Sequence, residues 1–368
     1  MNKPSLANRF KLCNGIKKFR DFQQDVFDKL NEYNKLCIIA SSGNGKTTIM
    51  KYLAFDFLDK NKNNKIIIFL NTNILCFNVA NSMISCLDDD DEKAFICNLA
   101  NYDKNNQITF DIIKNARIYI STPGKYLHLY KKIGFNFKLV CVDEIDILLD
   151  YNNDITSDIL NIFEMISFEY SFVSTSTIND SVYTQFLHKY DFATKILNDE
   201  GKLFEEIKSK VKCYKIRFQR KERDWYKIIC DQIYFILHSK QSCKKSIVFC
   251  NYKLDCDQLF NEYSATSKEK YCLHGNISVI DQNTILENYK EYGYILFTTD
   301  ISHRGLNIED IENVFHIGVT SKQIFYHRNG RSLRKPDSNP VSFLFYDELA
   351  ADNPLIQDFD EYNFNTRL

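Results

Sequence analysis

The segment Ala40–Thr47 (ASSGNGKT) constrains the fold of this 368-residue chain more than any other. It lies between a short apolar run at 37–40 and a segment of helical character at 48–57. Gly43 and Gly45 let the backbone curl so that its N–H groups point at phosphate oxygens, and the helix start adds a favourable dipole. The segment therefore predicts a phosphate-binding loop between a buried strand and a helix.

This loop predicts nucleotide and metal contacts. We expect Lys46 to reach the β- and γ-phosphates and the Thr47 hydroxyl to ligate Mg²⁺. The other nucleotide contacts predicted here are Ser42, Gly43, Asn44, Gly45 and Thr48. An ordinary glycine turn before a helix is the alternative, and the complete GxGKT pattern after a strand argues against it.

A second apolar run, at 139–142, ends at Asp143 and Glu144. A carboxylate at the carboxyl end of a parallel strand beside a phosphate-binding loop is well placed to hold magnesium, so Asp143 is the predicted Mg²⁺ ligand. Glu144 is expected to orient and deprotonate the attacking water. The acidic run Asp88–Glu92 lies between polar residues and is instead predicted to be a solvated loop.

The third element is His327–Arg334 (HRNGRSLR), a cluster of basic side chains. A solvated basic patch is the alternative interpretation. Its position after a phosphate-binding loop and an acidic strand end favours a functional role. The three elements in this order indicate an NTP-driven motor core built from two lobes.

Together these motifs resemble the DEAD-box family of ATP-dependent RNA helicases, in helicase superfamily 2, from about Gly15 to about Phe345. Gln23 stands at the glutamine of the family's Q motif, where an amide can bond both the donor and the acceptor edge of adenine. Asp143–Asp146 (DEID) is similar to the DEAD box, with isoleucine in place of alanine. His327–Arg334 keeps the charged positions of the family's HRxGRxxR pattern.

The resemblance implies further site residues. Arg331 and Arg334 would approach the γ-phosphate as arginine fingers. Contacts to RNA are implied for Thr72, Thr122, Pro123, Gly124, Lys125 and Thr299. Coupling between the lobes is implied for Asp146, Ser176, His327, Asp300 and Arg304.

The chain departs from the family pattern on its RNA-facing and interlobe elements. The replaced positions are Asn73 for an arginine, Ala100–Asn101 for a glycine pair, Val279 for a glutamine, Gln282 for an arginine and Asn307 for an aspartate. Losing an arginine contact to phosphate weakens nucleic-acid binding in a salt-dependent way. ATP hydrolysis is therefore the firmer expectation and strand separation the weaker one.

The predicted fold class is α/β, with two tandem RecA-like domains that each contain a parallel sheet flanked by helices. We place the ATP-binding lobe at 1–198, a polar linker at 199–210 and the C-terminal lobe at 211–368. Strands of the first lobe are predicted at 37–40, 66–70, 118–120, 139–142 and 172–174, and those of the second at 211–216, 247–250, 295–298, 314–317 and 341–345.

Composition narrows the environment and the partners. A net charge of −1 means that RNA affinity would need a local groove lined by residues such as Lys125, Lys322 and Arg304. The twelve cysteines form no CxxC pair, which favours a reducing intracellular compartment, the cytoplasm or the nucleus. Neither a signal peptide nor a membrane span is predicted.

The resulting prediction is an ATP-dependent RNA helicase with ATP and Mg²⁺ as cofactors. It binds RNA without sequence specificity and works as a monomer, with an activating protein partner left open. Two alternatives remain: an ATP-gated RNA clamp with little unwinding, and a RecQ-like DNA helicase. The second rests on Phe19–Gln23 and Thr175–Thr177, which also resemble RecQ-type motifs, whereas the HRxGR pattern favours the DEAD-box family.

Overall fold

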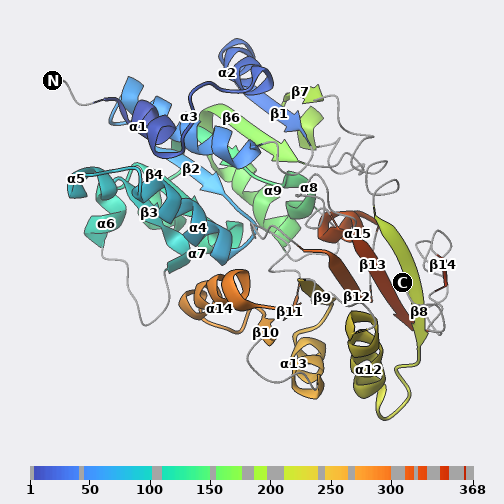
Figure 1. Cartoon of the computed structure of the whole chain (residues 1–368). Coiled ribbons are helices and arrows are strands. Elements are labelled where there is room, and N and C mark those ends of the chain that lie inside the picture. Colours follow the sequence, from blue (N-terminus) through green and yellow to red (C-terminus); the bar gives the residue numbers. More distant parts are fainter. Residues whose placement is uncertain are drawn as a thin grey trace. The chain divides into compact units, whose positions relative to one another are not determined.

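The computed structural model describes residues 4–40, 45–101, 110–149, 155–175, 186–196, 211–238, 245–263, 270–299, 311–318, 322–329, 340–347 and 360–361. The chain divides into two compact units, Met1–Glu200 and Gly201–Leu368. The predicted linker at 199–210 lies outside the described residues, so its bounds stay a prediction. The two units are described separately below (Figure 1).

Unit 1 contains a seven-stranded sheet with the order β3-β4-β2-β5-β6-β1-β7, in which all the described pairings are parallel. Its strands are β1 (Lys35–Ile39), β2 (Ile66–Phe69), β3 (Ile96–Asn98), β4 (Ile118–Ser121), β5 (Asn136–Val142), β6 (Ser167–Thr175) and β7 (Ala193–Ile196). The helices are α1 (Leu6–Cys13), α2 (Asp21–Tyr33), α3 (Lys46–Lys60), α4 (Asn73–Ile84), α5 (Asp90–Lys93), α6 (Phe110–Asn115), α7 (Pro123–Ile133), α8 (Ile145–Leu148) and α9 (Ile155–Met165), with a 3₁₀ turn at Leu99–Asn101.

Both faces of this sheet are buried, and successive side chains of a strand enter the two hydrophobic cores in turn. Ile66 and Ile68 pack into a core with residues of α1, α3 and α4. Ile67 and Phe69 point the other way, into a core with residues of α7, α8 and α9. Successive side chains of a strand point to opposite faces, so an unbroken apolar run is what a strand covered on both sides requires.

Unit 2 contains a second seven-stranded sheet, with the order β10-β11-β9-β12-β13-β8-β14, and its described pairings are again all parallel. The strands are β8 (Lys212–Phe218), β9 (Ser246–Cys250), β10 (Lys270–Leu273), β11 (Ile295–Thr298), β12 (Asn313–Ile317), β13 (Val341–Asp347) and β14 (Asp360–Glu361). Its helices are α12 (Trp225–His238), α13 (Lys253–Glu262), α14 (Val279–Tyr292) and α15 (Lys322–Asn329). Subtracting seven from each strand number gives the order of unit 1, so the two units share one topology although the sequence shows no repeat.

The acidic run Asp88–Glu92 corrects one prediction, because it is not simply a solvated loop. Asp89 caps a short helix, α5, with its carboxylate accepting a hydrogen bond from the N–H of Asp91 at 3.0 Å. Acidic residues in a first helical turn interact favourably with the helix dipole, which explains why this run is helical. Glu92 also accepts two hydrogen bonds from the buried guanidinium of Arg9, at 2.6 and 2.7 Å.

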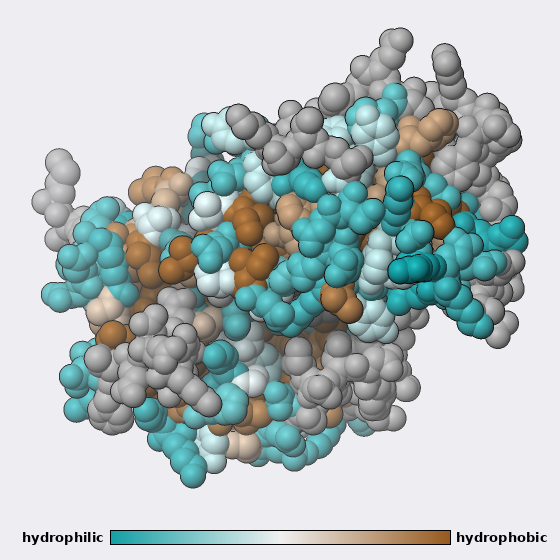
Figure 2. All heavy atoms as spheres, turned by 90° about the horizontal axis from the view of Figure 1, so that it is seen from below, coloured by the Kyte–Doolittle hydropathy of each residue, from teal (hydrophilic) through white to brown (hydrophobic). Residues whose placement is uncertain are grey.

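Hydrophilic residues cover most of the coloured area of the face shown in Figure 2, with hydrophobic residues exposed between them. Within the part of the chain that the structure describes, no helix is both long and apolar enough to cross a membrane.

Candidate active site

The strand order of unit 1 brings the carboxyl ends of four strands together. Strands β2, β5, β6 and β1 are neighbours in the sheet and run parallel, so their carboxyl ends lie along one edge. The residues at these ends are Asn71, Asp143, Ser174 and Ala40. Ligands of open parallel sheets bind at such an edge, which makes this one the candidate active site.

Lys46 and Thr47 open helix α3 and face this edge. Gly45 precedes them with φ of +80°, a left-handed conformation that favours glycine. The buried Lys46 ammonium donates a hydrogen bond to the main-chain oxygen of Ala40 at 2.6 Å, across the mouth of the loop. The predicted contacts Ser42, Gly43 and Asn44 lie outside the described residues, whereas Thr48 is the third residue of α3.

Asp143 is at the centre of the site. Its carboxylate accepts hydrogen bonds from the Thr47 hydroxyl at 2.8 Å and from the Ser174 hydroxyl at 2.6 Å. Burial raises the pKa of Asp143, and the nearby charge of Glu144 raises it further, against the opposing effects of Ser174, Lys46 and Thr47. A buried carboxylate beside a hydroxyl is a set of hard oxygen donors, so Thr47 and Asp143 fit the predicted Mg²⁺.

Glu144 has an uncommon backbone and a defined side-chain partner. Its φ and ψ are 52° and 54°, the left-handed region that non-glycine residues rarely adopt, and it caps α8. The Asn71 amide donates a hydrogen bond to the Glu144 carboxylate at 2.8 Å. Sequence reasoning missed both Asn71 and Ser174, although each is a polar residue at the end of an apolar strand, which is the signal that could have found them.

Gln23, the predicted adenine-reading residue, is buried beside the phosphate loop. Its side-chain oxygen accepts a hydrogen bond from the N–H of Arg20 at 3.1 Å and so caps helix α2. A Cβ added to Gly45 would lie 2.8 Å from the Gln23 amide nitrogen, so the glycine also gives this side chain room. The amide oxygen retains a second lone pair for a ligand.

Comparison with known proteins gives the family. Residues 20–184 match the DEAD/DEAH box helicase family, and residues 221–336 match the helicase conserved C-terminal domain. The chain belongs to the DEAD-box helicase family. The resemblance to this family that the sequence motifs predicted is thereby confirmed.

Curated relatives of this DEAD-box chain are distant. It is 23% identical over 266 residues to the ATP-dependent RNA helicase FAL1 of Candida albicans, covering 69% of this chain and 62% of the relative. It is 26% identical over 305 residues to the DEAD-box ATP-dependent RNA helicase RhpA of Helicobacter pylori, covering 80% of this chain and 58% of the relative. The chain therefore spans about three fifths of the length of these relatives.

Solved structures confirm the predicted fold class of tandem RecA-like domains. Dbp5 of S. cerevisiae bound to RNA and ADP BeF3 has a TM-score of 0.73 at 17% identity, covering 98% of this chain and 94% of the other. Mss116 bound to single-stranded RNA and UDP-BeF has the same TM-score at 18% identity, covering 98% and 81%. A Mycobacterium smegmatis helicase, Lhr, bound to single-stranded DNA, scores 0.67 at 14% identity, covering 93% and 47%.

The RNA-binding residues predicted for this DEAD-box chain lie at helix starts in unit 1. Thr72 caps α4, accepting a hydrogen bond from the N–H of Leu75 at 3.3 Å. Thr122 stands at the cap of α7, with Pro123 as its first residue. Strands β2 and β4, which precede these helices, are neighbours, so both helix starts lie along the same edge of the sheet.

The remaining residues predicted to bind RNA lie in both units. A Cβ added to Gly124 would lie 3.2 Å from the Asp158 carboxylate of α9, so close packing there favours glycine. Lys125 is the third residue of α7 and is half-buried. In unit 2, Thr299 follows β11 and its N–H donates to the Leu273 oxygen at 3.3 Å.

The predicted interlobe residues are described only in part. Asp146 is buried in α8, and His327 lies in α15 with its side chain outside the described set. Outside the described residues lie Ser176, Asp300, Arg304, Arg331 and Arg334. Their roles stay predictions.

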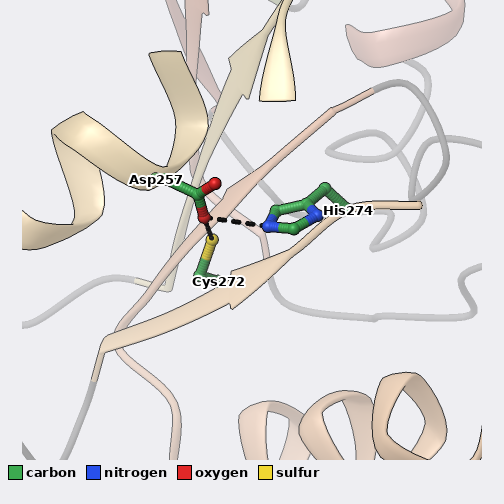
Figure 3. Close-up of side chains that lie close together, drawn as sticks. All are labelled: Asp257, Cys272 and His274. Atoms are coloured by element: carbon green, nitrogen blue, oxygen red, sulfur yellow. Dashed lines mark hydrogen bonds and ion pairs between the residues drawn. The ribbon is translucent and has the colours of Figure 1, made fainter. Parts of the chain in front are cut away.

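A separate polar cluster lies in unit 2, where Asp257 of α13, Cys272 of β10 and His274 point toward one another (Figure 3). Their ligand-type atoms all lie within 4.8 Å of one another. The N–H of Asn276 donates to His274 Nδ1 at 3.3 Å, so in the neutral ring the proton is on Nε2, which lies 2.8 Å from an Asp257 oxygen. A metal ion at Nε2 would have to displace that proton, so we interpret the cluster as a hydrogen-bonded link between α13 and β10.

Proposed function

We propose that this DEAD-box protein is an ATP-dependent RNA helicase that couples ATP binding and hydrolysis to local duplex separation or RNA–protein remodelling. The carrying observation is the cluster in which Thr47 and Ser174 flank the buried carboxylate of Asp143. Glu144 follows directly and Lys46 is on the adjacent helix start. The names of the curated relatives, both ATP-dependent RNA helicases, support the same function.

The residues of unit 1 divide the chemistry between them. Lys46 exchanges its bond to the Ala40 oxygen for the β- and γ-phosphates of ATP. Thr47 and Asp143 would hold Mg²⁺, which supplies charge neutralisation at the phosphates when it is bound. Glu144 orients the attacking water and accepts its proton.

Unit 2 supplies the other half of the proposed reaction. Arg331 and Arg334 approach the γ-phosphate, so turnover requires both units to meet around ATP. The interlobe residues predicted above would transmit this closure. ATP and RNA then favour the same closed state, which couples their binding by linkage.

RNA binding in this proposal uses the helix starts at Thr72 and Thr122. Helix N-termini present N–H groups and a positive dipole end, which suit phosphate oxygens. Contacts to phosphate and ribose carry no base information, so little sequence specificity is expected. The chain's net charge of −1 fits a local groove of this kind better than a broadly basic surface.

An ATP-gated RNA clamp is the second candidate, and a specific observation favours it. Asn73, which stands where the family has an arginine, is the first residue of α4, directly after the capping Thr72. A neutral side chain at this helix start removes one contact to RNA phosphate. The clamp would bind RNA when ATP is present but separate few duplexes.

Steady-state ATP turnover tests these proposals. We would measure it without nucleic acid, with single-stranded RNA and with single-stranded DNA of the same length. Glu144→Gln is the inactive variant, and Glu169→Gln, a surface glutamate paired with Lys138, is the matched control. We expect RNA to stimulate turnover in the wild type and in Glu169→Gln and to have no effect in Glu144→Gln.

Other results would point elsewhere. Equal or stronger stimulation by DNA would favour the RecQ-like DNA helicase. Absent turnover with ATP-dependent RNA retention would favour the clamp. A chain that neither hydrolyses ATP nor retains RNA would overturn both proposals.

A further inference from the structure

Asn71 links two strand ends of the proposed active site. It lies two residues beyond β2, directly before Thr72, and its amide donates a hydrogen bond to the Glu144 carboxylate at 2.8 Å. The backbone brings them together, because the N–H of Asp143 donates to the Phe69 oxygen at 3.1 Å. The contact therefore follows from the pairing of β2 with β5.

The environment of Asn71 indicates that its amide has a role beyond packing. The side chain is buried, with 6% exposed. Among the described residues its amide oxygen has no hydrogen-bond partner, although it is fully shielded from solvent. A buried polar atom without a partner lowers stability, so a chain that needed only packing here would do better with an apolar residue of similar size.

Glu144 needs an external restraint. Its left-handed backbone, with φ of 52°, is maintained by the turn into α8, where the N–H of Ile147 donates to the Glu144 oxygen at 3.0 Å. This fixes where the side chain begins but not where the carboxylate ends, because a glutamate side chain has three rotatable bonds. The Asn71 amide supplies a restraint at the carboxylate.

We propose that Asn71 is a positioning residue that holds the Glu144 carboxylate in the orientation from which it accepts the proton of the attacking water. The proposal rests on the ATP hydrolysis proposed above. Asn71 itself exchanges no proton and forms no bond to substrate. Its loss slows the chemical step and leaves nucleotide binding intact, because Lys46 would contact the phosphates and Thr47 would hold Mg²⁺ without it.

The test separates kcat from KM. Asn71→Leu keeps the size of the side chain and removes the donor. We expect kcat to fall by about 10- to 100-fold with KM for ATP changed by less than about twofold. Asn71→Gln, which retains an N–H donor, recovers part of kcat. In a Glu144→Gln background, Asn71→Leu causes no further loss, because the group that it positions is already inactive.

Asn313 is a matched control in unit 2. It is 1% exposed, its amide donates to the Ser246 hydroxyl at 3.2 Å, and its own amide oxygen has no partner among the described residues. It begins β12, at the opposite end of the strand from the carboxyl edge. Asn313→Leu repeats the structural change of Asn71→Leu, so we expect it to leave kcat unchanged.

The outcomes distinguish the two proposals. Wild-type turnover with an unchanged kcat in Asn71→Leu would overturn the positioning role and leave the proposed function standing. An equal loss of kcat in Asn313→Leu would also overturn it, because general destabilisation would then explain both variants. No turnover in the wild type would overturn the proposed hydrolysis and the positioning role together.

Discussion

The two units share one strand order but use the same edge of the sheet in opposite ways. In unit 1, Asn71 follows β2 and donates to Glu144, which lies beyond β5. Strands β9 and β12 hold the corresponding places in unit 2. There Asn251 follows β9 and accepts a hydrogen bond from Arg328 at 3.1 Å. An asparagine just beyond the carboxyl end of corresponding strands, two residues after β2 and one after β9, thus serves a carboxylate in one unit and a guanidinium in the other.

The difference shows which buried charge serves the fold. Arg328 is fully buried, donates also to the Gly318 oxygen at 3.2 Å, and lies over the Phe249 ring at 5.2 Å. Oxygen acceptors and an aromatic face stabilise a guanidinium in the interior. For Asp143 the opposite holds, because burial and a neighbouring carboxylate raise its pKa despite its hydroxyl partners. We infer that the buried charge of Arg328 stabilises unit 2, whereas the buried charge of Asp143 serves the chemistry of unit 1.

The largest effect is expected for Asp143→Asn, a variant that distinguishes a role in chemistry from a role in stability. Removing the carboxylate should lower ATP turnover by about 100-fold or more, because the electrostatic contribution of a metal site is several kcal/mol. The same variant should be at least as stable as the wild type at neutral pH. Turnover assays and urea denaturation of the two proteins measure both effects, and a variant that is less stable at pH 7 would contradict the interpretation.

The pH dependence of that stability has a definite sign. The folded pKa of Asp143 is raised above the ordinary value of 3.8, so the unfolded chain loses this proton at lower pH than the folded chain. The contribution of Asp143 to wild-type stability therefore falls as the pH rises from 3.8 through the raised folded pKa. The stability advantage of Asp143→Asn should be absent below this window and complete above it.

Arg328→Met tests the other half of the comparison. It removes a fully buried guanidinium and leaves the partly buried Gly318 oxygen and Asn251 side-chain oxygen without that donor, so we expect unit 2 to lose about 3 kcal/mol. Chemical denaturation measures the loss. Arg117→Met is the control, because that guanidinium also donates to main-chain oxygens but at an exposed site, and about 1 kcal/mol or less is expected there. Equal losses would show that the burial of Arg328 contributes nothing.

Sequence predicted the sheets better than the contacts between their loops. Long apolar runs such as 139–142 gave strands because both faces of each sheet are covered. Strands β3 and β14 were missed because three and two residues carry no readable pattern. Strands β7 (ATKI) and β10 (KYCL) were missed because each contains a lysine and offers no apolar run of four residues. Lys46, Thr47 and Asp143 were found because their loop and strand signals are local. Asn71 and Ser174 also stand at the ends of apolar strands, but which strand ends meet depends on the strand order, and a single sequence does not reveal that order.

The smallest expected effects come from putting the same substitution at Asn71 and Asn251, which follow corresponding strands. Asn251→Asp gives Arg328 a charged acceptor in place of an amide, and charge-assisted hydrogen bonds are stronger, so we expect a gain of up to about 1 kcal/mol. Asn71→Asp instead sets a carboxylate against Glu144 and removes the donor between them, so we expect a loss of about 1 kcal/mol or more. Denaturant midpoints of the two variants, measured at pH 7, give both signs in one experiment. Opposite signs follow only if the two asparagines serve opposite charges, and two changes of the same sign would remove the basis of the comparison.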